Sequence, residues 1–196
     1  MRDQDIRNVI WERLEAEHAS DPDTLMLDEL SLAHGSTRVD VAVINGELQG
    51  YELKSAKDTL ERLPTQVSIY STILDRATLV VSECHLEKAL PALPEWWGVW
   101  IATRKSGHIA LLEDRPPQLN PNPNPVAVAS LLWRQEALQK LVDLGADRGV
   151  RGKPREQVYD RLALSMDLPS LQKFVRRTLK DRCNWRSDRR QIRCDD

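Results

Sequence analysis

The chain has 196 residues, enough for one ordinary domain or for a domain of about 120 residues with a small appendage. Apolar residues make up 41% of it, which suffices for a core, and no apolar run approaches the length of a membrane span. The charged first residues lack the apolar segment of a signal peptide, so we expect a cytoplasmic protein without a membrane partner.

The net charge of −2 hides an uneven distribution along the chain. Residues 1–144 carry 14 Lys and Arg against 22 Asp and Glu, whereas residues 145–196 carry 14 against 8. A basic C-terminal part beside an acidic body suggests a polyanionic partner, with some of the acids serving as metal ligands. A solvated, charged helical tail explains the charge equally well.

The N-terminal third predicts a helix followed by three strands. Apolar residues at helical spacing indicate a helix over 3–19, and a strand with Glu29 embedded in it follows over 24–34. Residues 37–55 predict two further strands joined by a tight turn at Asn45-Gly46, a strong hairpin signal.

The register of this hairpin decides whether its acidic residues meet. A two-residue turn at 45–46 would place Glu52 on the face opposite Asp40, because a shift of one residue exchanges the faces of a strand. We expect a bulge at Gly50 to restore the register and to bring Asp40 opposite Glu52. A three-residue turn that includes Glu47 would do the same.

The middle of the chain completes an α/β pattern. A capping-box pattern at 58–61 predicts the start of a helix, which Pro64 kinks or restarts and which continues to about residue 75. Further elements are expected as a buried strand at 77–81, a short helix at 85–93 and strands at 97–103 and 108–113. The order α-β-β-β-α-β predicts a mixed α/β sandwich.

The C-terminal part is expected to be helical. The Pro- and Asn-rich stretch 115–125 lacks amide donors and predicts an extended linker. Helical patterns follow at 126–144, 155–165 and 170–182, before a frayed tail at 186–196. We therefore expect a core at 1–114, the linker at 115–125 and a basic helical region at 126–196.

Three charged residues of the hairpin predict a chemical site. Glu52 and Lys54 are two apart, so both side chains leave the same face of an extended strand, and Asp40 comes from the preceding strand. Two carboxylates and an ammonium group suit a divalent cation and a water molecule that attacks a phosphodiester. Gln66 and Tyr70 follow at helical i,i+4 spacing.

This combination resembles the PD-(D/E)XK nuclease superfamily, whose fold is restriction-endonuclease-like. Asp40 matches the first acidic position, Glu52 and Lys54 match the E-x-K motif, and Gln66 and Tyr70 match the QxxxY helix motif. The runs RVD, GYELKS, DTLERL and PEWWG are similar to those of small bacterial members of the superfamily, and the similarity covers most of residues 1–185. The resemblance implies an αβββαβ core with a mixed sheet and a C-terminal helical appendage. In this sequence Val39 stands where the superfamily's name has proline.

The resemblance also implies a metal site that holds Mg²⁺ or Mn²⁺. Asp40, Glu52 and the backbone carbonyl of Leu53 would supply oxygen ligands. Glu29 is the candidate for the further acid usually found upstream, and Glu12 and Glu15 are alternatives.

Further roles follow from the same resemblance. Lys54 would orient the attacking water or stabilise charge on phosphorus, and Gln66 and Tyr70 would hold the site or contact the DNA backbone. Five basic residues are candidates for phosphate contacts: Lys57, Arg62, Arg176, Arg177 and Lys180. The last three belong to a run of basic residues on the predicted helix 170–182, which a solvated helix face explains equally well.

The sequence thus predicts a Mg²⁺-dependent DNA nuclease, in DNA repair or in defence against foreign DNA. The alternatives are a non-catalytic module on the same fold, which binds nucleic acid or recruits proteins, and an RNA-cleaving enzyme. Because cutting both strands often needs two active sites, a homodimer is plausible. Trp96, Trp97 and Trp100 could stack on bases, although such a cluster more often belongs to a core.

Overall fold

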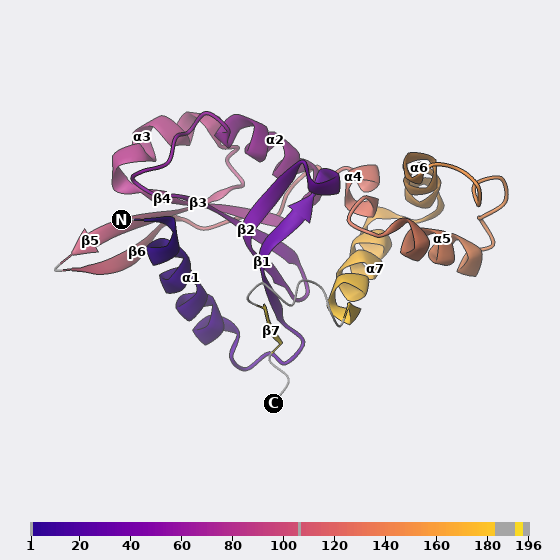
Figure 1. Cartoon of the computed structure of the whole chain (residues 1–196), viewed down its shortest axis with the longest axis horizontal. Coiled ribbons are helices and arrows are strands. Elements are labelled where there is room, and N and C mark those ends of the chain that lie inside the picture. The colour runs from indigo at the N-terminus through magenta and orange to yellow at the C-terminus, as the bar shows by residue number, and fades with distance from the viewer. Residues whose placement is uncertain (1, 106, 183–190, 194–196) are drawn as a thin grey trace.

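The computed structural model describes residues 2–105, 107–182 and 191–193, and it has an α/β architecture with a mixed sheet (Figure 1). The helices of the α/β part are α1 (Asp3–His18), α2 (Leu63–Ile73) and α3 (Leu86–Ala89). The strands are β1 (Leu25–Leu32), β2 (Thr37–Ile44), β3 (Leu48–Lys54), β4 (Arg76–Ser82), β5 (Gly98–Lys105), β6 (His108–Arg115) and β7 (Gln191–Arg193). The C-terminal helices are α4 (Pro125–Ala129), α5 (Arg134–Asp143), α6 (Arg155–Ser165) and α7 (Leu168–Asp181).

The sheet order is β6-β5-β4-β3-β2-β1-β7. Strands β1, β2 and β3 form an antiparallel meander, whereas β4 pairs in parallel with both β3 and β5. Helix α2 makes the crossover between the parallel strands β3 and β4. The predicted order α-β-β-β-α-β and the general α/β class are confirmed.

Each side of the sheet has its own hydrophobic core. Helix α1 buries Ile6, Ile10, Trp11 and Leu14 in a cluster with residues of β1–β5, which include Val41 and Leu53. The second cluster joins α2 and the C-terminal helices to the sheet in one continuous core. The two clusters place α1 and α2 in different apolar layers of the fold (Figure 1).

The three tryptophans that could have stacked on bases are core residues. Trp96, Trp97 and Trp100 are buried. The ring of Trp97 stacks on Tyr70 with 6.0 Å between ring centroids. Trp96 and Trp97 therefore pack in the core on the side of helix α2, whereas Trp100 packs in the cluster with α1.

The hairpin has the three-residue turn, and the expected bulge at Gly50 is wrong. Ile44 pairs with Leu48, and the register runs without a shift to Val41–Tyr51. The Asn45 side chain stabilises this turn by accepting the Glu47 amide at 3.0 Å. Gly50 instead allows the Leu74 side chain to pack closely against the strand, since a Cβ atom at position 50 would lie 2.5 Å from a methyl carbon of Leu74.

Helix α2 begins at Leu63, so a helix start at the 58–61 capping box is wrong. Asp58 accepts a hydrogen bond from the Ser55 amide at 2.7 Å and thereby closes the turn after β3. Pro64 occupies the first turn of α2, where its missing amide costs nothing. The predicted helix 85–93 consists of α3 flanked by short 3₁₀ turns, and the predicted helix 126–144 is divided into α4 and α5.

The linker lies along helix α2. Asn120 donates from its side chain to the carbonyl oxygens of Ser71 and Leu74, and the Asn124 amide donates to Thr72. These bonds satisfy carbonyl groups near the C-terminal end of α2, which have no partner within the helix. The linker therefore fixes the helical region to the α/β part.

The tail prediction falls mostly outside the described residues. Residues 191–193, however, form β7, which pairs antiparallel with β1 at the edge of the sheet. For these three residues the expectation of a frayed tail is wrong.

Asp75 makes the main polar connection between the sheet and α7. Its carboxylate accepts the Leu48 amide at 2.6 Å, the Gln172 side chain at 2.6 Å and Arg176 at 2.8 Å. Burial raises the pKa of Asp75, and the Leu48 amide and Arg176 oppose the rise. Arg176, predicted to contact phosphate, is thus part of this buried network.

Replacing Arg176 by methionine should lower the free energy of unfolding by about 1–3 kcal/mol, since Asp75 would keep its charge but lose its cationic partner. Urea denaturation would measure the loss. Arg177→Met is the matched control, because the Arg177 side chain is 83% exposed and should change stability by less than about 0.5 kcal/mol. Equal effects of the two substitutions would contradict this role of Arg176.

Candidate active site

The acidic residues of the hairpin lie where β2 and β3 separate. Strand pairing ends at Val41–Tyr51, so Asp40 and Glu52 come next on the two strands. Burial raises the pKa of Asp40, and the nearby charge of Glu52 raises it further, to about 7. The two carboxylates therefore lie close together, with Glu52 buried and the Asp40 side chain 24% exposed.

Glu52 is the most enclosed member of the site, at 1% exposed. One carboxylate oxygen accepts from Lys54 Nζ at 2.5 Å and from Gln66 Nε2 at 2.6 Å. The other lies 2.5 Å from the Tyr70 hydroxyl. Gln66 also accepts from Lys54 through its carbonyl oxygen at 2.9 Å. The structure thus brings together four of the five residues predicted to be catalytic.

Asp40, the fifth, is held by donors from two other elements. One oxygen accepts from the Leu53 amide at 2.8 Å, and the other accepts from Arg7 Nη2 at 3.0 Å. Arg7 also donates to the backbone carbonyl of Asp40 at 2.6 Å and to Asp28 at 3.2 Å. Sequence spacing gave no sign of Arg7, because it lies on α1, 33 residues from Asp40.

These residues line an open cleft of about 740 Å³ between the sheet and the start of α2. Asp40, Glu52 and Lys54 form its floor, and Lys57 and Arg62 lie on its walls. Lys57 and Arg62 are exposed. Two of the five basic residues predicted to contact phosphate therefore face the same cleft as the acids.

The other three basic residues lie elsewhere. Arg176, Arg177 and Lys180 line a separate cavity beside the hairpin turn at Asn45 and Gly46. Lys180 forms an ion pair with Asp23 at 2.5 Å. These three residues are therefore not among those that line the cleft with Asp40 and Glu52.

The candidates for the upstream acid differ in position. Glu29 lines the cleft and has a positive φ of 52°, an unusual backbone conformation for this residue type. Its carboxylate forms an ion pair with Arg38 at 3.1 Å. Glu12 and Glu15 do not line the cleft, and the α1 acid that does is Asp3.

The oxygen donors at this site are of the kind that Mg²⁺ prefers. Asp40 and Glu52 offer carboxylate oxygens at the floor of an open cleft, and Mg²⁺ is commonly held by one or two carboxylates while it keeps several waters. In the part of the chain that the structure describes, no group of three or more His, Cys, Asp or Glu is placed to hold a metal ion. A cation here would therefore depend on the two carboxylates, the Leu53 carbonyl and its own waters.

Replacing Tyr70 by phenylalanine should lower the free energy of unfolding by about 1–3 kcal/mol, because one oxygen of the buried Glu52 would lose its hydroxyl partner. The Tyr70 hydroxyl also lies 2.5 Å from the Arg38 carbonyl. Tyr51→Phe is the control, since the buried Tyr51 hydroxyl is 3.5 Å from Gln49. A smaller loss for Tyr70→Phe than for Tyr51→Phe, by urea denaturation, would disprove the contribution of this hydrogen bond.

Comparison with known proteins places the chain in a phage family. The whole chain, residues 1–196, matches the family model described as bacteriophage P4 protein cII. One curated relative, Protein cII of Enterobacteria phage P4, is 38% identical over 58 residues, which are 30% of this chain and 22% of that protein. No solved structure matches the chain. No helix among the residues described here is long and apolar enough to cross a membrane. Because the family model matches from the first residue to the last, the chain belongs to the bacteriophage P4 protein cII family.

Proposed function

We propose that this chain is a metal-dependent nuclease that hydrolyses DNA phosphodiester bonds. The observation that carries the proposal is the convergence of Asp40, Glu52 and Lys54 at the floor of one open cleft. The charge of Glu52 raises the pKa of Asp40, so the pair is costly to keep charged unless a cation joins it. A cation-binding role explains why the chain places them side by side.

We further propose that the fold is a restriction-endonuclease-like core and that the chain is related to the PD-(D/E)XK nucleases. The antiparallel meander β1-β2-β3, followed by the crossover α2 to the parallel strand β4, supports this assignment. So does the position of Gln66 and Tyr70, which reach Glu52 from α2. The QxxxY spacing thus has a direct structural use in the site.

The chain's own residues would have separate roles in this reaction. Bound Mg²⁺ would supply Lewis-acid polarisation of the scissile phosphate. Lys54 would place a positive charge beside that phosphate, held in position by Glu52 and Gln66. Lys57 and Arg62 would contact neighbouring phosphates from the walls of the cleft, and so fix the strand without reading its sequence.

The second candidate is a non-catalytic nucleic-acid-binding module on the same fold. The observation that favours it is that every carboxylate oxygen of Asp40 and Glu52 already has a protein donor. Such a module would bind nucleic acid in the cleft without taking up Mg²⁺. An RNA-cleaving enzyme would use the same residues and differ only in its substrate.

A cleavage assay with four substrates separates these candidates. The full chain is incubated with plasmid, linear duplex, single-stranded DNA and RNA, each with Mg²⁺, Mn²⁺ or EDTA. We expect DNA cleavage that requires the metal ion and that is lost in Asp40→Asn. DNA binding without cleavage in either metal would support the module, and cleavage confined to RNA would support the third candidate.

A further inference from the structure

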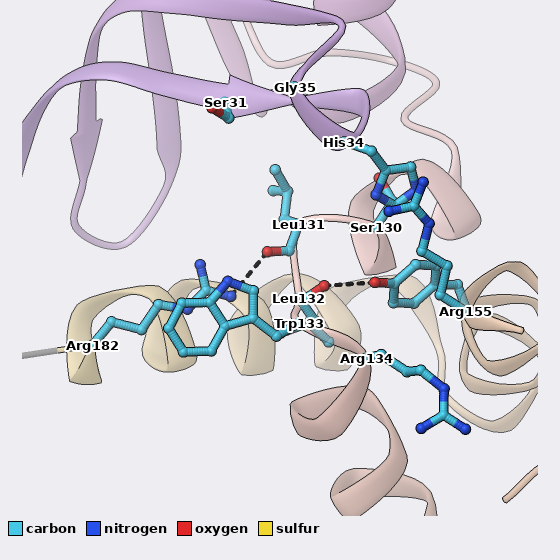
Figure 2. Close-up of a pocket in the computed structure, with 11 residues that line it drawn as sticks. Ser31, His34, Gly35, Ser130, Leu131, Leu132, Trp133, Arg134, Arg155 and Arg182 are labelled. Carbon is cyan, nitrogen blue, oxygen red and sulfur yellow. Dashed lines mark hydrogen bonds between the residues drawn. The ribbon is translucent and has the colours of Figure 1, made fainter. Parts of the chain in front are cut away.

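A second cavity adjoins the cleft on the side of the helical region. It has a volume of about 390 Å³, near the lower end of the range of about 300–1,000 Å³ for small-ligand sites. Figure 2 shows it between the turn that carries His34 and Gly35 and the segment Ser130–Arg134. Gly35 lines both this cavity and the cleft, so the two are neighbours across a single turn of backbone.

The lining of the cavity is cationic. Three arginines line it, Arg134, Arg155 and Arg182, and neither Asp nor Glu is among the lining residues. Arg182 forms an ion pair with Glu136 at 2.6 Å, and burial together with the charge of Arg155 lowers the pKa of His34, so the cationic character comes from Arg134 and Arg155. Arg155 forms an ion pair with Glu156, but both side chains are at least half exposed, and such pairs are weak. Arg134 donates to the backbone carbonyls of Arg151 and Lys153. The cavity therefore favours an anionic occupant.

Trp133 supplies an aromatic surface at the same place. The residue is 59% exposed, which is unusual for a tryptophan. The guanidinium carbon of Arg182 lies 4.4 Å from the centre of the indole ring, and Arg182 itself donates to the Leu131 carbonyl (Figure 2). The indole is thus supported by a buried cation while much of its surface stays open to solvent.

The wall opposite Trp133 is fixed by contacts between distant parts of the chain. His34, from the turn between β1 and β2, stacks on Tyr159 of α6 with 5.6 Å between ring centroids. The Tyr159 hydroxyl donates to the Leu132 carbonyl at 2.8 Å. Because these bonds join the turn to the helical region, the cavity is a preformed part of the fold.

We infer that this cavity binds a nucleotide of a single-stranded DNA extension that leaves the cleft, with a base on Trp133 and its phosphate beside Arg155. The inference rests on the proposed function, because it assumes that the cleft holds the DNA. Base stacking on an exposed aromatic ring and cationic contacts to phosphate are the two interactions by which proteins hold single strands without sequence preference. Both are available here within one cavity next to the cleft.

The test compares a blunt DNA hairpin with the same hairpin carrying a six-nucleotide extension at either end. Fluorescence anisotropy in EDTA measures binding of the full chain without cleavage. The wild type should bind one of the extended hairpins more tightly than the blunt one, by about 5- to 150-fold, which is the range for one stacked base. Trp133→Ala should abolish this preference and leave binding of the blunt hairpin unchanged, whereas Trp133→Phe should retain most of it.

The contribution of charge is tested separately. Arg155→Gln should lower the salt dependence of binding the extended hairpin by about 0.7 in the slope of log K against log salt, as expected for one lost phosphate contact on a single strand. Arg148→Gln is the matched control, since Arg148 is exposed and outside the cavity lining. An unchanged slope in Arg155→Gln would contradict the phosphate contact.

Two outcomes would overturn the inference while leaving the proposed function intact. One is equal affinity of the wild type for blunt and extended hairpins, together with metal-dependent cleavage of DNA. The other is tighter binding of a hairpin with an RNA extension than of one with a DNA extension. A preference for extended DNA that depends on Trp133, without cleavage in any metal, would instead sustain this binding site and refute the nuclease.

Discussion

Replacing Glu52 by glutamine should lower the rate of DNA cleavage by about 10²- to 10³-fold, the usual effect of removing one group that stabilises transition-state charge. Glutamine has nearly the shape of glutamate, so its side-chain amide can still form hydrogen bonds with Tyr70 and Gln66, although with a different arrangement of donors and acceptors. It lacks the negative charge that would hold a cation beside Asp40. The rate is measured on labelled duplex DNA at saturating Mg²⁺, with binding measured separately in EDTA.

Glu61→Gln is the matched control for the loss of an acid from the same cleft. Glu61 lines the cleft and is exposed, so its charge should contribute little to a cation held between Asp40 and Glu52. We expect this variant to cleave at nearly the wild-type rate. If Glu52→Gln also kept the wild-type rate in Mg²⁺, Glu52 would have no role in catalysis.

The sequence alone predicts the strand and the helix that carry four of the site residues. The spacing of Glu52 and Lys54 placed both side chains on one face of β3, where they are hydrogen-bonded to each other. The i,i+4 spacing of Gln66 and Tyr70 likewise predicted that both would lie on one face of a helix, and from that face both reach Glu52. These features are local, because strand and helix periodicities fix the direction of a side chain once the element is known.

The hairpin shows where local signals become ambiguous. An Asn-Gly pair favours a two-residue turn, but the Asn45 side chain here accepts the Glu47 amide, and the turn takes in a third residue. Glu47 is further held by Arg76 at 2.6 Å, from the start of β4. The length of the turn therefore depends partly on a residue that is distant in the sequence. A glycine at position 50 suggested a bulge, whereas its actual use is close packing against Leu74.

Long-range contacts account for the remaining misses. Arg7 reaches Asp40 from α1, and His34 reaches Tyr159 in α6, and neither pair has a spacing that a sequence pattern could detect. Arg176 shows the reverse error, since a basic residue on a helix suggested phosphate contacts, but its partner is the buried Asp75. Charge patterns identify basic residues but not the acids that neutralise them in the fold.

Replacing Lys54 by methionine should lower the free energy of unfolding in EDTA by about 3–5 kcal/mol, the usual cost of leaving one member of a buried ion pair without its partner. The Lys54 side chain is 5% exposed and that of Glu52 is 2% exposed, so water cannot replace the lost ammonium group. For a chain of this size the melting temperature should fall by roughly 6–20 °C. Calorimetric melting in EDTA and urea denaturation both measure the loss.

Adding Mg²⁺ gives the same variant a second, more specific expectation. A cation near Glu52 would compensate for the missing ammonium charge, so Mg²⁺ should raise the melting temperature of Lys54→Met more than that of the wild type, because binding to the folded state alone stabilises it. Lys57→Met is the matched control, because Lys57 lines the same cleft but is exposed, and its loss should change stability by less than about 0.5 kcal/mol. Equal, non-zero shifts with Mg²⁺ in the wild type and in Lys54→Met would contradict this compensation of the missing charge. No shift in either protein would mean that no cation binds beside Glu52, and the metal-dependent mechanism would then have to be abandoned.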